Sequence, residues 1–203
     1  MLICTPLFQH ILRSLVLTFM LVSSSLSSSA FAYEHLSDSA ALVMQKEYQS
    51  LEEALKEPAK VVRLNLKGRA LKAVPPEVLN LPNLQALILW NNEIKALPTE
   101  LSKLSNLQML DISGNADFNV LAAIPTLMNV KKLTILNLWN TELKVLPADI
   151  EKLSNIKILD VSTNLLVALP AEIGKLTSLQ KLVISSNKIT TLPPDIGKLS
   201  KLD

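Results

Sequence analysis

The sequence predicts an α/β solenoid, in which short parallel strands form one curved sheet and short helical turns form the opposite side. Two observations lead to this prediction. Of the 203 residues, 49% are hydrophobic but only 4% are aromatic, so the core must consist almost wholly of aliphatic side chains. The same pattern of Leu, Ile and Val also returns every 23 residues. Repetition with a period of roughly 20 to 50 residues is typical of stacked repeat architectures.

Residues 1–32 are predicted to be a secretory signal peptide. His10 and Arg13 precede an apolar run from Leu15 to Val22, and Ala30-Phe31-Ala32 has the small-x-small pattern of a cleavage site. The alternative, a membrane anchor, needs roughly 20 apolar residues, and this run is about half as long. We therefore expect a secreted or periplasmic protein with no stable membrane anchor after cleavage. Cys4, the only cysteine, leaves with the peptide.

A repeat unit occurs six times within residues 59–203. The same spacing returns from Ile156 and from Leu179, two further copies begin at Val61 and Leu133, and the third copy, from Leu107, has 26 residues. The pattern is clearest in the second copy, which contains Leu84, Leu87, Leu89, Asn92, Ile94, Leu97, Pro98, Leu101 and Leu104.

Each unit carries signals for a strand, a corner and a turn. The two leucines of L-x-L lie on one face of a short strand, because side chains alternate along a strand. The Asn that follows can bond backbone groups at the corner through its amide. The L-P pair ends the strand, since Pro has no N–H to donate. One unit buries too little apolar surface to fold alone, so the units must stack into a solenoid.

The pattern L-x-x-L-x-L-x-x-N-x-L, followed by L-P-x-x-I, resembles the leucine-rich-repeat family, in the subclass of Ras-group and plant intracellular repeats. The resemblance covers residues 61–203 and implies a leucine-rich-repeat solenoid of the bacterial exported type, with the sheet on its concave face. Three features depart from the pattern. Arg69 and Thr141 occupy the Asn position, and the third repeat has three extra residues. We expect this insertion to emerge as a loop on the binding face.

Residues 33–58 are predicted to form an N-terminal helical cap over the open core of the first repeat. Leu42, Leu51 and Leu55 recur at helical spacing within residues 38–56. Ser50 and Glu53 form a capping box for a second helix, which Pro58 ends. At the other end, a seventh unit opens at Leu202, and no C-terminal cap is expected.

The outward-facing strand residues should form two columns on the concave face. Trp90 and Trp139, the only tryptophans, flank Ser113 in the second column, and Phe118 in the insertion is expected to join them. The first column contains Asn65, Ile88, Asp111, Asn137, Asp160 and Val183, and the second contains Lys67, Trp90, Ser113, Trp139, Ser162 and Ser185.

Two interpretations of the tryptophans stay open at this point. Aromatic side chains within a polar surround are typical of protein-binding hot spots, which favours a binding site formed by Trp90, Ser113, Trp139 and Phe118 with Ile88, Asp111, Asn137 and Asp160. In the alternative, each ring only fills space over the neighbouring coil. Acid–base pairs three residues apart after each L-P, such as Asp149 and Lys152, indicate a solvated convex face.

The sequence argues against catalysis, cofactors and metals. After cleavage His35 is the only histidine and no thiol is left, so neither a Ser/His/Asp site in the repeats nor a Cys/His metal cluster can form. Asp111 and Asp160 are expected two strands apart, roughly 10 Å, on an open surface that does not exclude water, so carboxylate chemistry is not expected there. A net charge of +2 gives no reason to expect nucleic acid as a partner.

The leading hypothesis is therefore an exported module, not an enzyme, that binds a protein or peptide through its concave face. The alternative is a structural or truncated repeat fragment that associates with another chain through its uncapped C-terminal coil.

Overall fold

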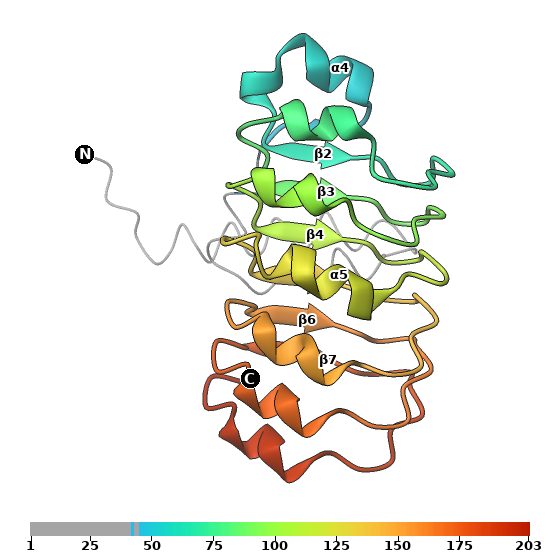
Figure 1. Ribbon diagram of the computed structural model, residues 1–203, viewed down its shortest axis with the longest axis vertical. Coiled ribbons are helices and arrows are strands. Elements are labelled where there is room, and N and C mark those ends of the chain that lie inside the picture. The colour runs from blue at the N-terminus through green and yellow to red at the C-terminus, as the bar shows by residue number, and fades with distance from the viewer. Residues whose placement is uncertain (1–41, 43–44) are drawn as a thin grey trace, which may run out of the picture.

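The repeats form a continuous solenoid in the computed structural model, which describes Leu42 and residues 45–203. The predicted signal peptide and most of the first part of the predicted cap lie outside the described residues. In the described part, seven parallel strands pair in chain order to form one sheet (Figure 1). They are β1 (Glu47–Tyr48), β2 (Arg63–Asn65), β3 (Ala86–Ile88), β4 (Met109–Asp111), β5 (Ile135–Asn137), β6 (Ile158–Asp160) and β7 (Lys181–Val183). The predicted fold class is confirmed.

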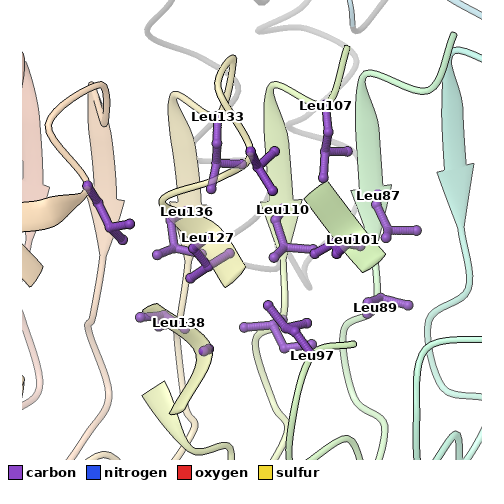
Figure 2. Close-up of a cluster of buried hydrophobic side chains, with 14 of the residues drawn as sticks. Leu87, Leu89, Leu97, Leu101, Leu107, Leu110, Leu127, Leu133, Leu136 and Leu138 are labelled. Carbon is purple, nitrogen blue, oxygen red and sulfur yellow. The ribbon is translucent and has the colours of Figure 1, made fainter. Parts of the chain in front are cut away.

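The register of the strands places equivalent residues of successive repeats side by side. Leu87 lies opposite Leu64 on one side and Leu110 on the other. These inward leucines have no exposed surface, and leucines of neighbouring repeats gather in rows in the same interior (Figure 2). Full burial of one such side chain contributes roughly 1.5–3 kcal/mol. The core is therefore a stack of identical aliphatic layers, as the 23-residue period predicts.

An asparagine closes the corner after four of the strands, β3, β4, β6 and β7. The side-chain oxygen of Asn164 accepts hydrogen bonds from the backbone N–H of Thr141 (3.0 Å) and Leu143 (2.9 Å) in the preceding repeat. Its amide nitrogen donates to the carbonyls of Leu138 (2.8 Å) and Val161 (2.9 Å). Equivalent bonds hold Asn92, Asn115 and Asn187. Each asparagine thus ties its own coil to the one before it.

Short 3-10 helices cover the convex side, and each of η2 to η6 starts directly after a proline, whose ring fixes φ near the helical value. Asp149 pairs with Lys152 at 2.9 Å as predicted, whereas Lys175 bonds Glu151 of the preceding turn. Both pairs are largely exposed and contribute little to stability. The turns are η1 (Pro58–Lys60), η2 (Pro76–Asn80), η3 (Thr99–Lys103), η4 (Ala148–Lys152), η5 (Ala171–Lys175) and η6 (Pro194–Lys198).

The insertion of the third repeat forms a helix, α5 (Val120–Leu127), and not the predicted loop on the binding face. The side chain of Asn119 caps the helix by accepting from the N–H of Ala122 at 3.0 Å. Val120, Ala123 and Leu127 are buried at helical spacing, and α5 packs between η3 and η4 on the convex side. The sequence from 120 to 127 is mostly apolar, so burial against the core is favoured over a solvated loop.

The N-terminal cap is only partly helical. The helix α4 (Leu51–Lys56) begins at Ser50, whose hydroxyl accepts from the N–H of Glu53 at 3.1 Å, as the predicted capping box requires. The prediction of a helix over residues 38–56 is wrong at Glu47–Tyr48, which forms β1 and pairs in parallel with β2. This pairing brings Tyr48 into the core opposite Leu64, and an aromatic residue suits a half-covered strand.

The last repeat is less well buried than those before it. Leu192 is 50% exposed, whereas its equivalent in the fourth repeat, Leu146, is 2% exposed. The apolar residues of this coil that pack on the core are only partly buried, and they are Leu182, Ile184, Ile189, Ile196 and Leu202. Residues 184–192 line a hollow of about 330 Å³, excluding Lys188.

Candidate functional site

Three parallel rows of side chains cross the side of the sheet that faces away from the core. The predicted central column is confirmed by the register, in which Ile88, Asp111, Asn137 and Asp160 pair in succession. The tryptophan column follows it two residues later along each strand. A third row precedes it by two residues and consists of Arg63, Ala86, Met109, Ile135, Ile158 and Lys181.

The middle of this surface is buried, contrary to the prediction that its side chains are free to contact a partner. Asp111 and Asn137 have 0% of their surface exposed, and Ile88, Ser113 and Asp160 have 5% or less. Burial is limited to the central strands, since Asn65 in β2 and Val183 in β7 are half-buried. Two causes are visible. The polar side chains bond back along their own strands, and Leu42 belongs to an apolar cluster on this side.

Each of the two aspartates of the central column accepts hydrogen bonds from the serine two residues later in the chain. The Oδ1 of Asp111 accepts from both the N–H (3.0 Å) and the hydroxyl of Ser113, and Asp160 bonds Ser162 in the same way. Burial raises the pKa of Asp111 to about 6, although the bonds from Ser113 oppose the rise. Burial raises the pKa of Asp160 as well, against the bonds from Ser162.

Two buried polar atoms in the central column have no hydrogen-bond partner. They are Oδ2 of Asp111, an acceptor, and Nδ2 of Asn137, a donor. The two residues are direct neighbours on β4 and β5. The side-chain oxygen of Asn137 is engaged, because Oδ1 accepts a hydrogen bond from the N–H of Trp139 at 3.0 Å. An unsatisfied buried polar group costs about 1–3 kcal/mol, so this pair needs an explanation.

Each tryptophan leans onto the following coil and stays half-buried. The indole of Trp90 lies so close to Gly114 that a Cβ there would be 3.1 Å from its Nε1, and Gly114 also has a φ of +63°. On its other side, Nζ of Lys67 is 5.8 Å from the ring centroid. The Nε1 of Trp139 donates to Oγ1 of Thr163 at 2.9 Å. The rings therefore pack between coils, as the alternative interpretation holds, and keep part of their surface exposed.

Phe118 does not join the tryptophans. It is 4% exposed and belongs to the main aliphatic core together with Val120 and Leu127 of α5. The prediction of one aromatic patch is therefore wrong for Phe118, because folding of the insertion into a convex helix draws this ring inward.

The sequence analysis missed the apolar part of the third row. Ala86, Met109, Ile135 and Ile158 are 3% exposed or less and form a second apolar cluster with Leu42, separate from the core. The signal was present, since an apolar residue stands directly before the first leucine of L-x-L in four successive repeats. That position faces away from the core, where alternation alone predicts polar residues.

Metal and membrane chemistry find no support in the described part of the chain. No group of three His, Cys, Asp or Glu side chains there could hold a metal ion. Within Leu42 and residues 45–203, no helix has the length and hydrophobicity needed to span a bilayer.

Two family profiles match the repeats. One is described as a leucine-rich repeat region and covers residues 121–203, and the other is described as a leucine rich repeat and covers residues 59–116. The chain belongs to the leucine-rich-repeat family. Leucine-rich-repeat domains typically act as protein-interaction modules and not as enzymes. No curated protein matches the chain.

Two solved structures show how far the similarity extends. A leucine-rich-repeat protein of Leptospira interrogans is 27% identical with a TM-score of 0.55, over 79% of this chain and 52% of that one. A plant peptide hormone receptor, RGFR1, in complex with RGF2, is 32% identical with a TM-score of 0.50, over 69% of this chain and 22% of that one. This leucine-rich-repeat protein thus spans about half the length of the first and about a fifth of the second.

Proposed function

We propose that this leucine-rich-repeat protein is an exported module that binds a peptide or an extended segment of a partner protein through its concave face. The site is centred on Trp90, Ser113 and Trp139, with Asp111 and Asn137 in the adjacent column. Export is supported by the signal-peptide pattern of residues 1–32, and N-terminal sequencing of the exported protein should start at Tyr33.

The observation that carries this proposal is the pair of unpartnered atoms on neighbouring strands. A peptide group has one N–H donor and one C=O acceptor. Oδ2 of Asp111 can accept that N–H, and Nδ2 of Asn137 can donate to that C=O. Bound main chain would thus satisfy both atoms at once. Trp90 and Trp139 would contribute apolar contact on either side of Ser113, as aromatic side chains do in binding hot spots.

The comparison with the peptide hormone receptor supports the class of ligand. That receptor was solved in complex with RGF2, and the aligned part of it shares 32% identity with this chain. A parallel sheet whose outer side combines polar residues with half-buried tryptophans is a surface on which an extended chain can lie.

Binding can be tested by capture of partners from the native exported fraction with the mature protein as bait. The double variant Trp90→Ala/Trp139→Ala should lose the captured protein while its melting curve changes little. The single variant Asn137→Leu removes the free donor and should weaken capture about tenfold, which corresponds to one lost hydrogen bond in a desolvated site. Asn155→Ala on the convex side is the matched control. Equal capture by all four proteins would contradict the proposal.

A second candidate function, self-association, is favoured by the partly buried last coil. Leu192 is 50% exposed beside half-buried Ile184 and Ile189, which leaves apolar surface that a second copy could cover. Light scattering tests this directly. Leu192→Lys should convert an assembled form to a monomer, whereas Val167→Lys, at a 62% exposed position in the preceding repeat, should not. A wild-type protein that is monomeric at high concentration would exclude this candidate.

A further inference from the structure

The outer face of α5 is an apolar stripe on a convex side that is otherwise rich in charge. Leu121, Pro125 and Met128 follow one another at helical spacing and are all exposed, Leu121 by 58% and Met128 by 42%. Neither end of α5 contains an acidic or a basic residue. The opposite face of the helix is buried in the core, and Asn119 caps its start, so the stripe is held in place. Contiguous exposed apolar surface is typical of interaction sites.

The two turns that flank α5 are built differently. η3 has Glu100 in its first turn and Lys103 in its last, and η4 has Asp149 and Lys152 in the corresponding places. Glu100 and Lys103 are exposed, and the side chains of Asp149 and Lys152 are 46% and 44% exposed although they form an ion pair. On each side of the apolar stripe, therefore, lies a turn that is acidic at its start and basic at its end.

The segments before and after α5 repeat this order of charges. Asp117 precedes the helix and forms an exposed 3.5 Å ion pair with Lys95, and the exposed Lys131 and Lys132 follow its end. Three neighbouring elements thus run from acidic to basic in the same direction. A parallel copy of this surface would place like charges together, which is unfavourable, whereas an antiparallel copy places acid opposite base in all three elements.

We propose that α5 is the contact surface of a back-to-back dimer, in which two copies of this chain meet antiparallel across their convex sides. A twofold axis parallel to the direction in which the repeats stack reverses α5 but keeps each element opposite its own copy. The apolar stripe then packs on itself, Glu100 faces the partner subunit's Lys103, and Asp149 faces the partner subunit's Lys152. A second copy therefore supplies both the apolar and the charged complement of this surface.

The size of the stripe and its place in the stack bear on the strength and the use of this contact. Eight residues of α-helix are about 12 Å long, so the stripe alone is smaller than the roughly 800 Å² per subunit of a standard interface. The charged turns η3 and η4 must contribute as well. Because α5 lies midway along the stack and on the side opposite the concave face, the dimer leaves both concave faces open (Figure 1). Two such faces bind a repeated partner with greater avidity than one.

Sedimentation velocity of the exported, mature protein over a range of concentrations tests the contact. We expect a concentration-dependent dimer, and Leu121→Asp should raise its dissociation constant about tenfold or more. The matched control, Val145→Asp, introduces the same charge at a 69% exposed position outside α5 and η4 and should leave the constant unchanged. Both positions are exposed, so the melting temperatures should stay close to that of the wild type. A monomeric wild type, or equal effects of the two variants, overturns the dimer.

Charge reversal tests the antiparallel arrangement. Glu100→Lys should weaken the dimer, because the introduced lysine faces the partner subunit's Lys103. The double variant Glu100→Lys/Lys103→Glu should regain the wild-type dissociation constant, because each copy again presents acid to base. A parallel arrangement gives the opposite result, since position 100 would then face the partner subunit's Asp149. A dimer that Glu100→Lys strengthens, or that the double variant does not restore, overturns the antiparallel contact.

Two further variants separate this dimer from the functions proposed above. Leu192→Lys alters the last coil and should leave the α5 dimer unchanged. If Leu192→Lys abolishes assembly and Leu121→Asp does not, self-association through the last coil is correct and the α5 dimer is overturned. Trp90→Ala/Trp139→Ala changes the opposite side of the sheet, so it should affect capture of the partner protein but not the dissociation constant of the dimer. A loss of the dimer in this double variant would likewise contradict a contact through α5.

Discussion

Both faces of the sheet contain buried apolar side chains, but the two apolar clusters differ in extent. On the core face, Leu87 and Leu110 lie in a continuous cluster that runs through every repeat and is closed by the convex turns. On the concave face, Met109 and Ile135 belong to a small separate cluster, which Leu42 and the partly buried Val62 join from outside the strands. The first kind of burial depends on the whole stack. The second involves only five buried residues, so we expect it to contribute less to the stability of the fold.

The largest effect on the free energy of unfolding is expected from substitution of a core residue. It is best compared with substitution of the adjacent residue on the opposite face of the sheet. Leu110→Ala should lower the free energy of unfolding by about 2–5 kcal/mol, because the cavity lies in a rigid stack. Met109→Ala should lower it by about 1 kcal/mol, because Met109 belongs to the small second cluster and not to the continuous core. Urea denaturation followed by circular dichroism measures both values. Similar losses for the two variants would mean that the faces are equally part of the core.

A smaller effect is expected from the corner asparagines, which support only the core face. Asn164→Ala leaves four backbone groups of two coils without their partner and should destabilise the protein by about 3 kcal/mol. Asn187→Ala, in the half-buried last coil, should lose about half as much, because water can replace the side chain. Loss of the same free energy in both variants would contradict this account of the last repeat.

The exclusion of water from the concave face can be measured through Asp111. Burial raises the pKa of Asp111 from 3.8 to about 6, so the folded protein holds this proton more tightly than the unfolded chain does. The associated stability is present below about pH 4 and is lost as the pH rises to about 6. Asp111→Asn keeps an oxygen for Ser113 but cannot ionise. The wild type should therefore lose on the order of 2 kcal/mol more than the variant between about pH 4 and pH 7.

Denaturation curves at several pH values provide this measurement. If the curves of the wild type and Asp111→Asn run parallel, then the concave face is hydrated and the carboxylate is not buried.

The smallest effect is expected at the edge of the concave face. Trp139→Phe removes the 2.9 Å hydrogen bond to Thr163 but keeps an aromatic ring over the next coil. We expect a loss of about 0.5–1.5 kcal/mol in the free energy of unfolding, the usual value for one partly exposed hydrogen bond. A loss as large as that of Leu110→Ala would place this indole among the structural residues and weaken its assignment to a binding site.

Much of the fold could be predicted because the repeat is local. The spacing of Leu84, Leu87 and Leu89 already decides which side chains share a face, and Pro98 decides where the next turn begins. The strand Glu47–Tyr48 could not be predicted in the same way. It has only two residues, and it is a strand because β2 offers it an open edge and because Arg63 pairs with Glu47.

For the candidate site, the sequence predicted which residues lie side by side but not how deeply they are buried. The sequence placed Asp111, Asn137 and Asp160 in one column, because a register of 23 or 26 residues follows from the repeat. It did not predict their burial, or the unpartnered atoms, or the place of Phe118. Each of these depends on segments distant in the chain, namely the helix α5 on the convex side and Leu42 on the concave side.

The sequence by itself determined the solenoid, its register and the rows of side chains. The periodic spacing decides to which face of a strand each side chain points, and this does not depend on tertiary contacts. Only the tertiary structure decided which of those rows are exposed. Exposure depends on contacts with residues outside the periodic pattern, such as Leu42 on the concave side and α5 on the convex side. The local spacing of the repeat does not encode these contacts.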